Sequence, residues 1–88
     1  MLPIKLIGID HSHGLESLRS NLIVALESLG LKANITEITD VDEIISLDIY
    51  GIPALMIDGQ VLFQKEVPTT EAIYKALEAH IGKTPTPE

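Results

Sequence analysis

The chain has 88 residues, of which 45% are hydrophobic and 22% are charged, and its formal net charge is −7. This length allows one small domain, and the apolar fraction is typical of a folded chain. Its six Lys and Arg residues are spread along the sequence, which argues against nucleic-acid binding because that function needs clustered positive charge. The lack of cysteine excludes disulfides, thiolate metal sites and thiol redox chemistry carried by this chain's own side chains.

The first half of the sequence predicts a strand, a helix and a second strand. Residues 3–9, PIKLIGI, form a short apolar run that is typical of a strand. Leucines then recur at helical spacing from Leu15 to Leu29, and Gly30 is expected to end this helix in the left-handed conformation. Either Ser12 or Asp10 is expected to cap its N-terminus. Alternating apolar residues over 31–38 predict the second strand.

The second half predicts a short helix, a hairpin and a last helix. Asp40 is followed three residues later by Glu43, which is typical of a helix N-cap, and the acidic residues from Glu37 to Asp48 predict a solvated face. Asp58-Gly59 between the apolar runs 53–57 and 60–64 is a strong hairpin signal. Thr69 is expected to cap a final helix that ends at Gly82.

The predicted order of elements is therefore β-α-β-α-β-β-α, and the fold class is α/β. The first strand, helix and second strand form a crossover unit, which makes these two strands parallel. The hairpin adds antiparallel strands, so we expect a mixed four-stranded sheet with helices on both faces. Residues 1–82 form this domain, and residues 83–88, KTPTPE, form a flexible Pro-rich tail.

Four stretches carry a resemblance to a known family: the strand IKLIG, the leucine-rich helix, Ile52-Pro53 and the hairpin ALMIDG. In this order they resemble the thioredoxin-like superfamily, and most closely its small, glutaredoxin-sized members from archaea and bacteria. The resemblance implies a cis peptide bond before Pro53, which faces the family's active-site loop. It also implies that Ile52 offers its main chain to an extended substrate.

The same resemblance places the family's two redox cysteines at His11 and Gly14. Because disulfide exchange needs a thiolate nucleophile, the fold transfers to this chain and the reaction does not. We therefore expect a non-redox binding or assembly module, whose partner is a protein or an extended peptide, with a homodimer as another option. The expected site is the groove between loop 10–14 and the proline, with these residues: Asp10, His11, Ser12, His13, Gly14, Ile52 and Pro53.

Two alternatives remain for this loop. His11 and His13 form an H-x-H pair that could bind zinc or copper, with an oxygen from Asp10, although zinc sites usually have three or four protein ligands. Otherwise no cofactor is expected. Ser12 could instead polarise a bound thiol such as that of glutathione, but few basic residues are present to bind the carboxylates of glutathione, and we favour the capping role.

The N-terminal sequence does not have the features of a targeting segment. Its apolar run is broken by Lys5 and Asp10 and lacks a basic flank. No run of about 18 apolar residues occurs, so no transmembrane helix is expected. We expect a cytoplasmic protein that does not bind membranes.

Overall fold

A computed structural model of the protein describes residues 2–9, 12–47, 49 and 51–82. Its elements follow the predicted order β-α-β-α-β-β-α. They are β1 (Leu2–Ile7), α1 (His13–Leu29), β2 (Ala33–Ile38), α2 (Val41–Ser46), β3 (Ala54–Ile57), β4 (Gln60–Gln64) and α3 (Thr70–Gly82). The proposed tail, residues 83–88, lies outside the described residues.

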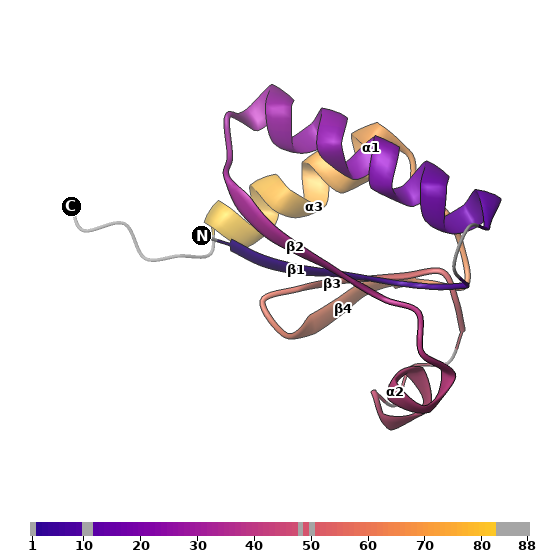
Figure 1. The fold of residues 1–88 in the computed structure, drawn as a ribbon. Coiled ribbons are helices and arrows are strands. Elements are labelled where there is room, and N and C mark those ends of the chain that lie inside the picture. The colour runs from indigo at the N-terminus through magenta and orange to yellow at the C-terminus, as the bar shows by residue number, and fades with distance from the viewer. Residues whose placement is uncertain (1, 10–11, 48, 50, 83–88) are drawn as a thin grey trace.

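The strands form one four-stranded sheet in the order β2-β1-β3-β4. β1 is parallel to β2 and antiparallel to β3, and β4 is antiparallel to β3. Helices α1 and α3 cover one face of the sheet, while α2 lies on the other side at one end (Figure 1). The predicted mixed sheet with helices on both faces is confirmed. Within the described ranges, no helix is both long and apolar enough to cross a membrane.

Two clusters of buried side chains hold these layers together. The larger one joins the sheet to α1 and α3, and its members are Ile4, Leu6, Leu15, Leu18, Leu22, Ala25, Leu26, Leu55, Ile57, Ile73 and Leu77. The smaller one faces α2 and consists of Ile7, Ile38, Ala54 and Met56. No residue of α2 is fully buried, and Ile44 and Leu47 only partly cover this second cluster. The main core therefore fixes α1 against β1 and β3, the elements that carry the predicted groove.

The ends of α1 are closed by the residues that the sequence indicated. The Ser12 hydroxyl accepts a hydrogen bond from the Leu15 N–H at 3.2 Å, so Ser12 is the N-cap. At the other end Gly30 has a φ of 66°. The Gly30 N–H donates to the carbonyl of Glu27, and the Leu31 N–H donates to that of Leu26, which is the Schellman arrangement. Because this cap uses Leu31, β2 begins at Ala33, two residues later than predicted.

The other local predictions are also confirmed. Asp58 and Gly59 both have positive φ angles, 53° and 83°, as a type I′ hairpin turn requires. The Asp40 carboxylate accepts hydrogen bonds from the backbone N–H groups two and three residues later and caps α2. The Thr69 hydroxyl accepts one from the N–H three residues later and caps α3. Each of these elements thus begins or turns at a residue whose side chain or flexibility is suited to that position.

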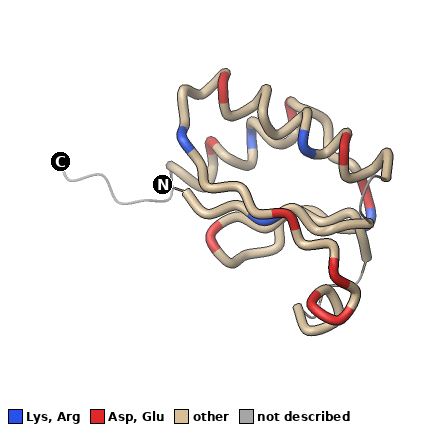
Figure 2. The backbone as a smooth tube through the Cα atoms, viewed as in Figure 1, with Lys and Arg blue, Asp and Glu red and all other residues tan. Residues whose placement is uncertain are grey.

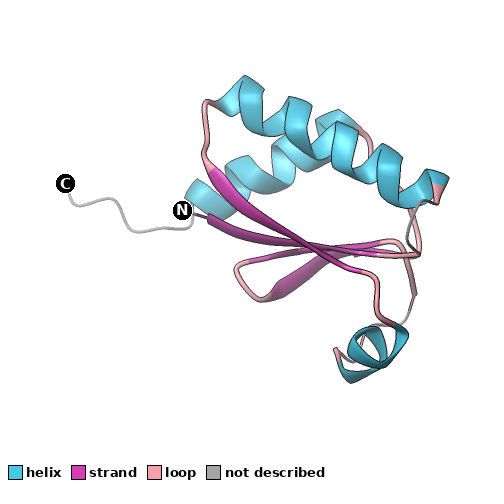
Figure 3. Ribbon diagram, viewed as in Figure 1, coloured by secondary structure: helices cyan, strands magenta, loops and turns pink. Residues whose placement is uncertain are grey.

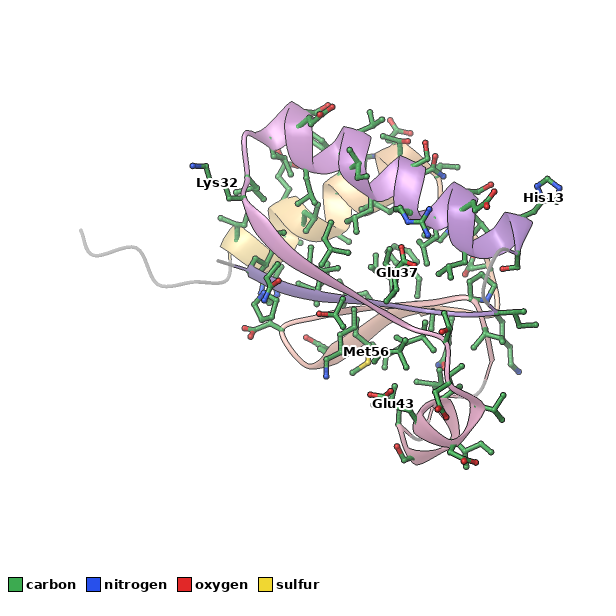
Figure 4. All side chains as sticks on the ribbon, viewed as in Figure 1. His13, Lys32, Glu37, Glu43 and Met56 are labelled. Atoms are coloured by element: carbon green, nitrogen blue, oxygen red, sulfur yellow. The ribbon has the colours of Figure 1, made fainter. Side chains whose placement is uncertain are left out.

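One acidic residue lies differently from the prediction. The sequence placed Glu37 with the solvated carboxylates around α2, where Figure 2 shows a cluster of acidic positions. In the structure Glu37 lies on the α1 side of the sheet and forms an ion pair with Arg19 (Figure 4). This pair links β2 to α1 across 18 residues of sequence. Strand alternation explains the difference, because neighbouring residues of β2 point to opposite faces.

This ion pair predicts a small pH dependence of stability. The hydrogen bond from Arg19 lowers the pKa of Glu37 below its usual value. The carboxylate therefore stabilises the fold above the usual pKa, and this contribution is lost as the pH falls through the lowered one. Because both side chains are partly exposed, we expect less than about 1 kcal/mol. Urea unfolding of Glu37→Gln should show a deficit at about pH 7 that shrinks at about pH 3, and an equal deficit at both pH values would contradict this assignment.

Candidate functional site

The first turn of α1 lies at the end of the sheet where β1 leads into the helix (Figure 3). A Cβ atom added to Gly14 would be 3.3 Å from Cγ of Pro53, so the two residues are in close contact. The peptide bond between Ile52 and Pro53 is cis. The two segments that the sequence assigned to opposite walls of one groove are thus neighbours in the fold.

A shallow, open hollow lies between these segments, and we call it the loop–proline hollow. It has a volume of about 170 Å³ and is lined by Ile9, Ser12, Gly14, Ile52 and Pro53. Four of these five residues belong to the predicted site, and Ile9 does not. The lining is mostly apolar. The hollow is smaller than the pockets of about 300–1,000 Å³ that hold drug-sized ligands, so its size suits a single side chain.

Ser12 has two roles in this geometry. Its hydroxyl caps α1 by accepting the Leu15 N–H, which confirms the capping prediction. Its own backbone N–H donates to the Ile9 carbonyl at 3.1 Å and closes the turn that leads into the helix. A hydroxyl that accepts one hydrogen bond can still donate its proton. The thiol-binding hypothesis requires such a donor, because the Ser12 O–H group would have to donate a hydrogen bond to the bound thiol.

The histidine pair is only partly described. His13 is exposed at the outer end of α1 and points away from the rest of the molecule (Figure 4). Asp10 and His11 lie outside the described residues. Among the residues that are described, no three His, Asp or Glu side chains gather in a way that could hold a metal ion. Metal binding by His11 and His13 therefore stays a prediction.

Three residues near the hollow were missed by the sequence reasoning. Ile9 follows β1 with 64% of its surface exposed, and Val67 is 37% exposed. Val67 Cγ2 lies 3.8 Å from the position of a Cβ on Gly14, so it borders the hollow. The stem of Lys65 crosses Gly51 so closely that a Cβ there would overlap its Cγ. Ile9 could have been found from the sequence, because it is an apolar residue just past the end of a strand. Val67 and Lys65 come close to the site only through the fold.

Lys65 also fixes the chain beside the hollow. Its backbone has a φ of 70°, and its N–H donates to the carbonyl of Pro53 at 3.1 Å. The pairing between β3 and β4 therefore continues up to the proline that lines the hollow. The carbonyl of Pro53 therefore accepts a hydrogen bond from within the domain.

Comparisons with known proteins agree with this fold. The family model for the thioredoxin domain matches residues 14–78. A thioredoxin from Methanocaldococcus jannaschii is 31% identical over 61 residues, which cover 69% of this chain and 70% of that relative. The match to the family model begins at Gly14, directly after His11, Ser12 and His13 in the sequence. The chain therefore belongs to the thioredoxin family, as a member without cysteine.

Proposed function

We propose that this domain is a non-redox binding module that takes an apolar side chain of an extended polypeptide in the loop–proline hollow. The observation that carries the proposal is the mostly apolar hollow, bordered by the exposed side chains of Ile9 and Val67. Thiol-disulfide exchange needs a thiolate, and the chain contains none. Burial of an apolar side chain is the interaction that this lining favours.

The size and charge of the site define the partner further. Full burial of one leucine-sized side chain contributes about 1.5–3 kcal/mol, so one such contact gives weak, reversible binding. Additional affinity has to come from the peptide main chain, for which Ile52 is the expected partner. The net charge of −7 favours neutral or basic polypeptides over acidic ones. The expected partner is thus an exposed, extended segment with an isolated apolar side chain.

A peptide titration followed by NMR tests this proposal. The probe is a capped peptide with a single leucine among glycine and serine residues, and its leucine-to-serine counterpart is the reference. The leucine peptide should shift the amide signals of Gly14 and Ile52, and the serine peptide should not. Ile9→Lys should weaken this binding about tenfold or more, because a charge replaces an apolar side chain that borders the hollow.

Val24→Lys is the matched control, because Val24 is also an exposed apolar residue, 47% accessible, but lies on α1 away from the hollow's lining residues. This variant should bind the peptide like the unmodified protein. Equal binding of both peptides, or equal weakening in both variants, would contradict the proposed site.

The two other hypotheses for the loop remain predictions with separate tests. Zinc or copper bound by His11 and His13 would shift the side-chain signals of both histidines at micromolar metal, and unchanged signals would end this hypothesis. Glutathione held through the Ser12 hydroxyl would lose affinity in Ser12→Ala. Binding of the leucine peptide distinguishes the proposed function from both, because it requires neither the imidazoles nor a thiol.

A further inference from the structure

The short helix α2 exposes apolar side chains to solvent. Val41 and Ile45 are 68% and 71% exposed, the highest values among the large apolar side chains that the structure describes. They are four residues apart on one helix, so they are neighbours on its surface. Ile44 and Leu47 instead pack against the smaller core cluster, whereas the two exposed side chains belong to neither core cluster. We call Val41 and Ile45 the α2 patch.

Exposed carboxylates flank the α2 patch, and they belong to Asp40, Asp42 and Glu43. Asp42 lies three residues before Ile45, which makes these two side chains neighbours on the helix surface. Figure 2 shows acidic positions and no basic position on α2. The whole stretch of residues 33–64 contains no Lys or Arg. The patch therefore combines apolar surface with a negative electrostatic potential.

We propose that the α2 patch docks a basic polypeptide segment, in which apolar side chains are flanked by lysine or arginine. The apolar side chains of this segment cover Val41 and Ile45, and its cations lie beside the carboxylates that flank them. This inference is independent of the proposed function, because no residue that lines the loop–proline hollow lies on α2.

Charge decides between the possible occupants of the α2 patch. A second copy of this chain, with its net charge of −7, would bring the same carboxylates against each other. Nucleic acids and anionic lipid surfaces are repelled for the same reason. A neutral apolar segment would remove water from the carboxylates without giving them a partner, which costs free energy. A basic segment is the occupant that suits both the apolar side chains and the charges.

The small size of the patch sets the expected affinity. Its two side chains supply little apolar area, and ion pairs at an exposed surface contribute only modestly. We expect a dissociation constant on the order of 100 µM at about 20 mM salt. Binding should be at least about threefold weaker at about 300 mM salt, because salt screens the attraction between the charges.

NMR titration of the unmodified chain with three capped peptides tests the proposal. The first peptide has leucines flanked by lysines in a background of glycine and serine. The second has glutamate in place of each lysine, and the third has serine in place of each leucine. The first should shift the amide signals of Val41 and Ile45, the second should not, and the third should bind at least about fivefold more weakly than the first.

Several outcomes of this titration would overturn the proposal. They are the absence of a shift with the first peptide and equal binding of the first peptide and either of the others. Shifts of the same signals when the chain alone is concentrated would also overturn it, because they would place a second copy on the patch. The signals of Gly14 and Ile52 report the loop–proline hollow separately, so failure at one site does not decide the other.

A pair of single variants tests the apolar part of the α2 patch. Ile45→Lys should weaken binding of the first peptide about tenfold or more, because a cation replaces an apolar side chain and repels the lysines of the peptide. Val24→Lys adds the same charge at an exposed apolar residue of α1 and should weaken binding less than about twofold. Equal weakening in both variants would overturn the assignment, since net charge alone would explain it.

A pair of double variants tests the carboxylates. Asp42→Asn/Glu43→Gln should weaken binding of the first peptide about threefold or more at about 20 mM salt and remove most of the salt dependence. Glu27→Gln/Glu78→Gln removes the same number of charges from exposed positions on α1 and α3 and should leave both properties nearly unchanged. An equal effect in the two double variants would contradict a contact between the peptide and α2.

Discussion

Replacement of Leu22 by alanine is expected to lower the free energy of unfolding by about 2–5 kcal/mol. Leu22 is completely buried in the cluster that includes Leu6 of β1, Leu55 of β3 and Leu77 of α3. The truncation removes apolar contacts and leaves a cavity between α1 and the sheet, since the surrounding layers can close only partly. Small domains have a total stability of about 5–15 kcal/mol, so this single change removes a large share of it.

Urea unfolding monitored by circular dichroism measures this loss, and Ile23→Ala is the control. Ile23 neighbours Leu22 on the same helix but is 40% exposed, so the same kind of truncation should cost less than about 1 kcal/mol. A matching loss in the two variants would contradict the cavity as its cause, because Ile23 is exposed and its truncation leaves no cavity in the core. A loss below about 1 kcal/mol in Leu22→Ala would contradict the packing of α1 described above.

The parts of the fold that could be predicted from the sequence depend on local chemistry. Ser12 and Thr69 cap helices because a hydroxyl can reach an N–H three residues away, whatever the rest of the chain does. Asp58-Gly59 turns the chain because both residues tolerate positive φ. The leucine spacing of α1 identifies its buried face in the same way. Each of these signals lies within about one helical turn of the structure that it determines.

The parts that could not be predicted depend on residues far apart in the chain. The partner of Arg19 is 18 residues away, and the chain comes back to the border of the hollow at Val67, far from Gly14 in sequence. Sequence reasoning placed the groove between loop 10–14 and Pro53 only through the resemblance to thioredoxins. Neither spacing nor periodicity could show that Ile9 and Val67 border it. The hollow therefore had to be located from the three-dimensional structure.

Asn21 forms another contact between residues far apart in the chain, and its replacement is expected to lower the free energy of unfolding. Its side-chain Nδ2 donates to the carbonyl of Pro68 at 2.9 Å, across 47 residues of sequence. Pro68 is buried, and within the described part of the chain this carbonyl receives its hydrogen bond from Asn21. A buried acceptor that loses its donor costs about 1–3 kcal/mol. Alanine at this position gains about 0.5 kcal/mol of helix propensity, so Asn21→Ala should lose a net amount of about 1 kcal/mol.

The control for Asn21→Ala is Ser20→Ala, which should change stability in the opposite direction. Ser20 is exposed on the same helix, so its replacement should add up to about 0.5 kcal/mol through helix propensity alone. Amide exchange should also rise around Val67 in Asn21→Ala, because the hydrogen bond holds the loop that borders the loop–proline hollow. If Asn21→Ala were as stable as Ser20→Ala, the bond to Pro68 would contribute nothing. If exchange rose uniformly instead, the hydrogen bond would stabilise the whole domain and not that wall of the hollow in particular.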